Sequence, residues 1–185
     1  MKFFLCIFLC LSMLTGCGSS GSELDEAMLL RQELLQQGCR FRATITADYG
    51  TDIYVFTLDC SADSAGTVSF SVTQPAAIAG ITGRISGEGA ALTFDDTVLA
   101  FPVLADNRLS PVCAPWVFLN TLRAGYLTGC GRAGEGLLIC ANDTYEENAF
   151  YLEIETTCDR IPIRADIYWN QQRIICLEIA DFVIE

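Results

Sequence analysis

The chain has 185 residues, of which 51% are hydrophobic and 18% charged, and its formal net charge is −12. This length and composition exclude a disordered chain and suit one domain with a hydrophobic core. The absence of histidine excludes Ser-His-Asp and Cys-His catalytic groups and most catalytic zinc sites. The acidic balance repels phosphate backbones. We therefore expect no enzyme, no cofactor, no metal site and no nucleic-acid partner.

The first segment has the pattern of an export signal. Lys2 is followed by apolar residues from 3 to 14, interrupted only by Ser12, and then by Leu14-Thr15-Gly16-Cys17. A dozen apolar residues suit a signal peptide and are too few to span a membrane. The last four residues resemble the lipobox of bacterial lipoproteins. The resemblance implies that residues 1–16 are removed and that Cys17 carries the lipid.

Removal of this leader changes the charge and places the chain at a membrane. Lys2 is the only lysine, so 10 arginines remain against 23 acidic residues, a net charge of −13. At least two acyl chains on Cys17 give a stable anchor. Residues 17–22 are the lipidated cysteine and a tether of five Gly and Ser residues that reaches about 12 Å. We expect a lipid-anchored protein on the extracytoplasmic face of the cell membrane, with the folded domain, residues 23–185, close to the bilayer.

A helix and several strands are predicted first in the folded domain. Ser22 is a suitable N-cap and Gly38 a suitable stop, which predicts a helix of about 14 residues. Leu24, Met28 and Leu35, with Ala27 and Leu34, fall on one helical stripe. Alternating or apolar runs then predict strands over residues 40–47, 53–60, 67–73, 81–85, 90–94 and 98–101.

A second helix is predicted in the middle of the chain, opened by Ser110-Pro111 and ended by Gly125. It is followed by five further strands, over residues 127–132, 137–141, 150–157, 163–169 and 173–183. Asn170-Gln171-Gln172 provides a turn between the last two. An antiparallel sheet of about ten strands must curl to cover its apolar face. The predicted fold is α+β, mainly β: a strongly curved half-barrel with both helices in its concavity and a cavity between them.

Short motifs support this architecture by their order along the chain. They are residues 41–49 (FRATITADY), 68–75 (VSFSVTQP), 78–85 (IAGITGRI), 151–155 (YLEIE) and 161–167 (IPIRADI). Their order resembles the LolA-type lipoprotein carriers, a fold shared by mycobacterial lipid-carrier lipoproteins and some spore-germination lipoproteins. The resemblance implies a hydrophobic guest held between an incomplete barrel and its helices. Some members act instead as sensor or partner-binding domains. The anchor at Cys17 departs from the periplasmic carriers, so free shuttling between membranes is not implied.

The side chains predicted to face inward are the candidate ligand-binding residues. They either line a pocket for a lipid or acyl chain or fill a core, and the sequence leaves both open. In the second case the chain is an interaction or sensor module for another envelope or cell-wall protein, such as one of sporulation or germination. The inward set is Phe41, Ile45, Val55, Val68, Phe70, Val72, Leu92, Trp116, Leu119, Ile154, Ile167 and Trp169. Arg42, Arg84 and Arg164 either bind a lipid phosphate, or lie on solvated strand faces or pair with acids.

Seven cysteines remain beyond Cys17, and none forms a CxxC motif. Counting back from the predicted hairpin turns places Cys130 opposite Cys140, and Cys39 within one residue of facing Cys60. We expect these as two candidate disulfides, with free buried thiols as the alternative. Cys176 faces the neighbourhood of Asp166 rather than another cysteine.

Overall fold

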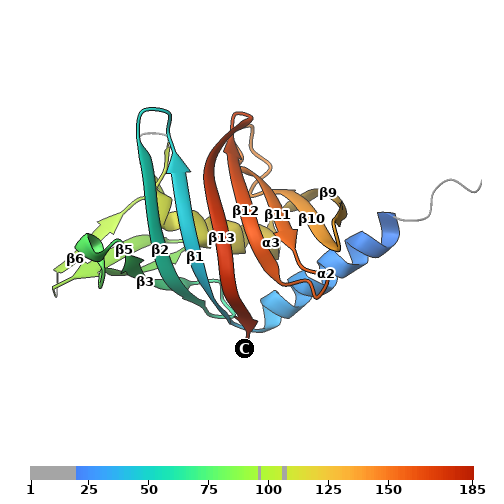
Figure 1. The fold of residues 1–185 in the computed structure, drawn as a ribbon, viewed down its shortest axis with the longest axis horizontal. Helices are drawn as coiled ribbons and strands as arrows, with labels where there is room; N and C mark the ends of the chain where they lie inside the picture. Colours follow the sequence, from blue (N-terminus) through green and yellow to red (C-terminus); the bar gives the residue numbers. More distant parts are fainter. Residues whose placement is uncertain (1–19, 96, 106–107) are drawn as a thin grey trace, which may run out of the picture.

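The computed structural model describes residues 20–95, 97–105 and 108–185. The predicted signal peptide and Cys17 lie outside these residues. The N-terminal half runs through helix α2 and a series of antiparallel strands (Figure 1). Its elements are α2 (Ser20–Gln36), β1 (Cys39–Asp48), β2 (Ile53–Ala62), β3 (Val68–Gln74), the short 3-10 helix η1 (Ala76–Ile78), β4 (Thr82–Ser86), β5 (Gly89–Phe94) and β6 (Thr97–Phe101).

The C-terminal half begins with a small hairpin and the second helix. Its elements are β7 (Leu104–Ala105), β8 (Arg108–Leu109), η2 (Pro111–Cys113), α3 (Ala114–Ala124), β9 (Tyr126–Ala133), β10 (Gly136–Asn142), β11 (Tyr151–Thr156), β12 (Pro162–Trp169) and β13 (Gln172–Ile184). The turn between β12 and β13 uses Asn170 and Gln171, both with positive φ (49° and 65°), as in a tight hairpin. The turn predicted at these residues is confirmed.

Eleven strands form one strongly curved antiparallel sheet, in the order β6-β5-β4-β3-β2-β1-β13-β12-β11-β10-β9 (Figure 1). The first and last strands pair at its centre, where Ile45 faces Leu177. The chain therefore builds one wing of the sheet outward from β1 and returns to the centre from the other wing. The predicted mainly-β half-barrel with two helices is confirmed.

Helix α3 occupies the concave side of the sheet, behind the central strands in Figure 1. Gly125 follows its last residue, as predicted, while Ser110-Pro111 opens the 3-10 turn η2 and the regular helix begins at Ala114 with Pro115 in its first turn. Phe118, Leu119 and Leu122 are fully buried. Phe118 meets Phe41 of β1 edge-on, with ring centroids 5.9 Å apart. This helix is therefore part of the core.

Helix α2 packs against β9, β10 and α3. It begins at Ser20, so three residues of the predicted tether are helical. Its buried stripe is Ala27, Leu30 and Leu34, while three leucine and methionine residues assigned to that stripe are about half exposed: Leu24 (43%), Met28 (49%) and Leu35 (52%). That part of the prediction was wrong, because leucines occur on several sides of this helix and its own periodicity does not choose between them.

Ion pairs hold α2 to the sheet in this orientation. Arg132 of β9 contacts Glu26 at 2.6 Å and Glu23 at 3.5 Å, and Arg160 contacts Glu33 at 3.2 Å. Among the described residues, no helix is long and apolar enough to cross a membrane.

Candidate functional site: an apolar pocket at the mouth of the half-barrel

An apolar pocket of about 450 Å³ opens beside the N-terminal end of α3. Its walls come from the turn between β1 and β2, from β2 and β3, from η1, and from the segment leading into α3. The lining residues are Tyr49, Asp52, Tyr54, Phe56, Val72, Ile78, Leu109, Ser110, Pro111 and Val112. We call this the mouth pocket. Its volume lies within the range of about 300–1,000 Å³ usual for small-molecule sites.

Two tyrosines shape one side of the mouth pocket. The Tyr49 hydroxyl donates a hydrogen bond to the Leu109 carbonyl, which joins the β1–β2 turn to the segment before α3. The Tyr49 and Tyr54 rings are 6.4 Å apart between centroids. Tyr54 and Phe56 both point to the concave face of β2, where Tyr54 is half exposed and Phe56 is buried. The pocket therefore joins the core at one end and water at the other.

The chemistry of the mouth pocket is that of a binding site. The side chains of Asp52 and Ser110 contribute polar atoms to the lining, and the remaining lining residues are hydrophobic or aromatic. Such a wall favours an apolar guest, since burial gives about 25 cal/mol for each Å² of apolar surface removed from water. In the described part of the chain, no group of three or more His, Cys, Asp or Glu side chains could hold a metal ion.

Most of the predicted ligand-binding residues lie in the core rather than in this pocket. Of the predicted set, Val72 alone lines it. Leu92, Trp116 and Trp169 are partly buried and pack against the core. The buried members are Phe41, Ile45, Val68, Phe70, Leu119, Ile154 and Ile167.

Val55 was placed on the wrong face by the prediction. It faces Thr46 of β1 on the convex side of the sheet and is 56% exposed. The start of β2, Ile53-Tyr54-Val55, is apolar on both faces, so hydrophobicity there did not reveal which residues point inward.

The sequence reasoning missed most of the mouth pocket. Tyr49 lies between the predicted strands 40–47 and 53–60, and Ile78 lies between those at 67–73 and 81–85. Leu109 precedes the predicted helix. The sequence feature that could have indicated this pocket was the number of apolar residues in segments outside the predicted strands.

The arginines considered for a lipid phosphate are mostly paired with acids. Arg42 contacts Asp59 at 2.8 Å and Asp181 at 3.2 Å, and Arg164 contacts Asp166 at 3.0 Å. Arg84 forms no ion pair with a described residue and lies in a separate, more polar groove of about 530 Å³.

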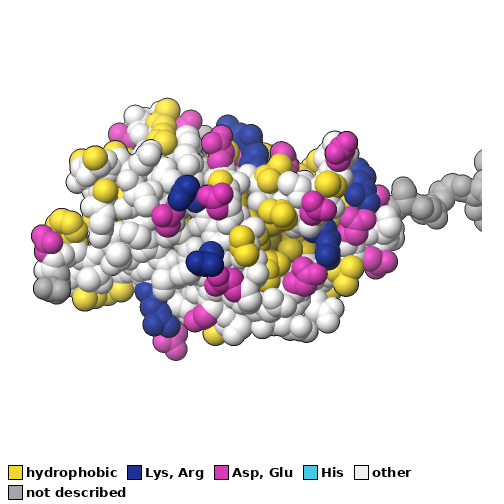
Figure 2. All heavy atoms as spheres, turned by 60° about the horizontal axis from the view of Figure 1, so that its bottom comes forward, with side chains coloured by type: hydrophobic (Ala, Val, Ile, Leu, Met, Phe, Trp, Pro, Cys, Tyr) yellow, Lys and Arg dark blue, Asp and Glu magenta, His cyan; other side chains and the backbone are white. Residues whose placement is uncertain are grey.

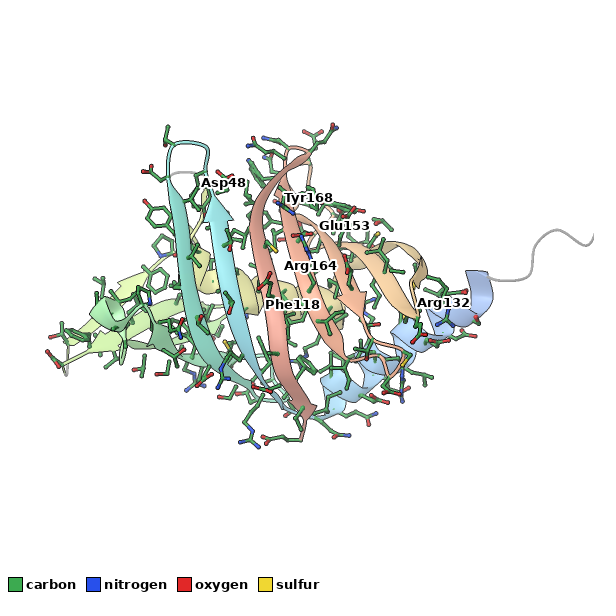
Figure 3. All side chains as sticks on the ribbon, viewed as in Figure 1. Asp48, Phe118, Arg132, Glu153, Arg164 and Tyr168 are labelled. Carbon is green, nitrogen blue, oxygen red and sulfur yellow. The ribbon has the colours of Figure 1, made fainter. Side chains whose placement is uncertain are left out.

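The convex face carries a polar network that the sequence did not reveal. Glu153, Arg164 and Tyr168 lie together there (Figure 3). Tyr168 donates a hydrogen bond to Glu153 at 3.0 Å, and the nearly buried Asp166 accepts two from Arg164, at 3.0 and 3.2 Å. Asp166 faces Cys176, as predicted. This network holds β11, β12 and β13 together across their outer face.

All seven described cysteines are free thiols. Cys39 faces Ala62 and Cys60 faces Phe41, so the first candidate pair is two residues out of register. Cys130 faces Ile139 and Cys140 faces Gly129. A one-residue offset puts Cys130 and Cys140 on opposite faces of the sheet. The predicted registers were therefore wrong for both pairs.

Exposed hydrophobic side chains are unevenly distributed over the surface. Figure 2 shows a hydrophobic hollow, bordered by charges of both signs, in the half of the molecule from which the grey N-terminal trace leaves. A second group lies on strands β5 and β6, where Phe94, Val98 and Leu99 are 53–65% exposed.

No protein-family model matches this chain, and no curated protein matches it either. Solved structures do match, and a LolA superfamily protein from Nitrosomonas europaea is among them, with 10% identity over 91% of this chain and 94% of that one and a TM-score of 0.45. The likeness to this protein is one of fold.

Two further similar structures have comparable coverage. An uncharacterised conserved protein from Thermus thermophilus shares 13% identity over 88% of this chain and 87% of that one, with a TM-score of 0.49. The Mycobacterium tuberculosis lipoprotein LppX shares 14% identity over 89% and 96%, with a TM-score of 0.44. At sequence identities this low, the comparison describes the fold alone. The functional argument therefore rests on the geometry of the chain itself.

Proposed function

We propose that this chain is an extracytoplasmic lipoprotein, anchored through Cys17, that binds a slender hydrophobic ligand such as an acyl chain in the mouth pocket. The observation that carries the proposal is the pocket of about 450 Å³ with its hydrophobic and aromatic wall. Chemistry on the ligand is not part of the proposal. The apolar lining of the mouth pocket supports the ligand class, and the resemblance of residues 14–17 to a lipobox supports the membrane location.

The filled concavity limits the size of this ligand. Because α3 occupies the space between the two wings, Phe41, Ile45 and Ile167 are core residues with 3% exposure or less. A guest therefore enters beside α3 and does not displace it. One acyl chain suits this space better than a whole multi-acyl lipid does.

The test is native mass spectrometry of residues 18–185, purified without denaturant, followed by organic extraction and lipid analysis. We expect a co-purifying lipid of defined mass. Ile78→Glu should abolish its binding, because Ile78 lines the pocket and is 40% exposed, so a charge there meets the ligand without entering the core.

The matched control is Ile163→Glu, the same substitution at a site outside the pocket with 42% exposure. It should retain the lipid. A ligand-free mass for the unaltered chain, with no uptake of added fatty acid or phospholipid, would refute the proposal.

A second candidate function is the binding of another envelope protein at the β6 edge of the sheet. It is favoured by one observation: β6 is an edge strand whose Val98 and Leu99 are 65% and 63% exposed, with no charged residue between Thr97 and Phe101. An uncovered apolar edge of this kind accepts an added strand from a partner.

A further inference from the structure

A second groove, of about 750 Å³, lies at the other end of α3, between that helix and α2. We call it the α2–α3 groove. Its apolar part is formed by Met28, Leu29 and Leu35, which are 49–52% exposed. Arg31 of α2 and Arg123 of α3 also line it. An apolar groove with two guanidinium groups is amphiphilic, and this distinguishes it from the mouth pocket.

The two arginines differ from most others in their partners. Arg40, Arg42, Arg132, Arg160, Arg164 and Arg173 all contact carboxylates. In the described part of the chain, neither Arg31 nor Arg123 has a carboxylate within ion-pair distance. In a chain with 23 acidic residues, this leaves two arginines of one groove without a described ionic partner. Arg31 is partly buried, and Arg123 is buried, with 8% exposure.

Both guanidinium groups are positioned by backbone carbonyls. Arg31 donates hydrogen bonds to the carbonyls of Leu122 at 2.8 Å and Thr121 at 3.3 Å and to that of Gly125. Arg123 donates to the carbonyls of Asp63 at 3.3 Å and Ser64.

These carbonyls compensate the two cations only in part. The C-terminal end of α3, which holds Arg31, carries about half a negative charge, less than the full positive charge of one guanidinium. Arg123 is held instead by two neutral carbonyls of the loop after β2. Burial lowers the pKa of Arg31, which shows that its charged form is poorly solvated here. Asp25 also lines the groove and offsets part of the excess without forming an ion pair among the described residues. A bound anion would complete the compensation.

The position of the groove brings it near the predicted anchor. Helix α2 begins at Ser20, three residues after Cys17. The exposed Leu24, Met28 and Leu35 continue along this helix from its N-terminal end. A chain anchored at Cys17 therefore presents α2 to the bilayer within a few residues of the membrane surface.

We infer that the α2–α3 groove binds one anionic phospholipid of the surrounding membrane, with its phosphate on Arg31 and Arg123 and an acyl chain over Met28 and Leu35. The inference rests on the proposed anchor, which brings the groove to the bilayer, and it is independent of the mouth pocket. The anchor overcomes the general repulsion of an acidic chain by anionic lipids, and the two arginines then recognise the headgroup locally.

The test is photolabelling of the full lipidated protein in phosphatidylcholine vesicles that contain a trace of diazirine-bearing phosphatidylglycerol or diazirine-bearing phosphatidylcholine. Intact mass first verifies the lipid on Cys17. We expect the phosphatidylglycerol probe to label the peptide that contains residues 28–35 about tenfold more than the other probe does, because both lipids carry the phosphate but the choline ammonium of phosphatidylcholine would lie near the guanidinium groups and be repelled by them. Met28→Asp should remove this preference, whereas Val183→Asp, at a site of similar exposure on β13, should keep it.

Three outcomes would overturn the inference. Equal labelling by both probes would show no headgroup recognition. Loss of labelling in excess inorganic phosphate would identify a site for free anions rather than for a lipid. Loss of labelling with Ile78→Glu would mean that the label reports the mouth pocket. A missing lipid on Cys17 would instead contradict the proposed anchor, and the same probes added with the unlipidated protein would still test the groove.

Discussion

Cys39, Cys60 and Cys113 are buried in the core and form no disulfide. Burial raises the pKa of the Cys39 and Cys113 thiols from 9.0 to about 12, and burial also raises that of Cys60 well above its usual range. A thiol that stays protonated is a poor nucleophile and a poor metal ligand. These cysteines therefore act as small hydrophobic side chains, which was one of the two alternatives left open by the sequence.

The raised pKa values predict a loss of stability in alkali. Above pH 9 the unfolded chain loses thiol protons that the folded chain keeps, so the free energy of unfolding falls as pH rises, until the folded thiols ionise near pH 12. The slope is up to about 1.4 kcal/mol per pH unit for each thiol. Cys113→Ala should make the slope shallower in urea titrations above pH 9, whereas Cys158→Ala, at an exposed thiol, should leave it unchanged. Equal slopes for all three proteins would contradict this account.

Among the secondary-structure elements, helix α3 determines whether the half-barrel is hollow. Its side chains Val117, Phe118 and Leu122 are at most 2% exposed. The helix fills the centre of the concavity and leaves two openings, the mouth pocket at its N-terminal end and the α2–α3 groove at its C-terminal end. The candidate sites are therefore set by where α3 begins and ends.

Truncation of Phe118 should test this role of α3. Phe118→Ala removes a fully buried ring that contacts Phe41, so we expect a loss of about 3–5 kcal/mol in the free energy of unfolding, measured with urea. Phe94→Ala removes the same ring where it is 53% exposed and should change stability by only about 0.5 kcal/mol. Comparable losses for the two variants would mean that α3 does not pack in the core.

At the scale of the whole molecule, the sheet remains open and its two edges are treated differently. Strand β9 is covered by α2, through the ion pairs of Arg132 and a hydrogen bond from the Cys130 thiol to the Glu23 carbonyl at 3.2 Å. Within the described part of the chain, no element covers strand β6 in this way, and its Leu99 is 63% exposed. The wing from β3 to β6 is therefore the part of the sheet that is available to a partner.

This asymmetry predicts where a protein partner would attach. A photoreactive amino acid at position 99 should yield a cross-linked protein of higher mass in intact cells, because β6 can accept an added strand. The same amino acid in place of Ile163, which is exposed on β12 near the centre of the sheet, should give none. Equal cross-linking at both positions, or none at position 99, would remove the second candidate function.

The sequence by itself determined the local elements and much of the architecture. Strand alternation in residues 40–47, the turn at Asn170 and the end of the second helix at Gly125 all depend on neighbouring residues, and the structure agrees with them. The start at Pro111 is a 3-10 turn, and the regular helix begins at Ala114. The number of strands then requires a curved sheet. Only the tertiary structure decided the pairing of β1 with β13, the outward position of Val55 and the buried face of α2. These depend on contacts between residues far apart in the chain, and a one-residue change of register reverses every side chain of a strand. The mouth pocket and the α2–α3 groove belong to the second group, because each is the space left where segments distant in sequence fail to pack completely.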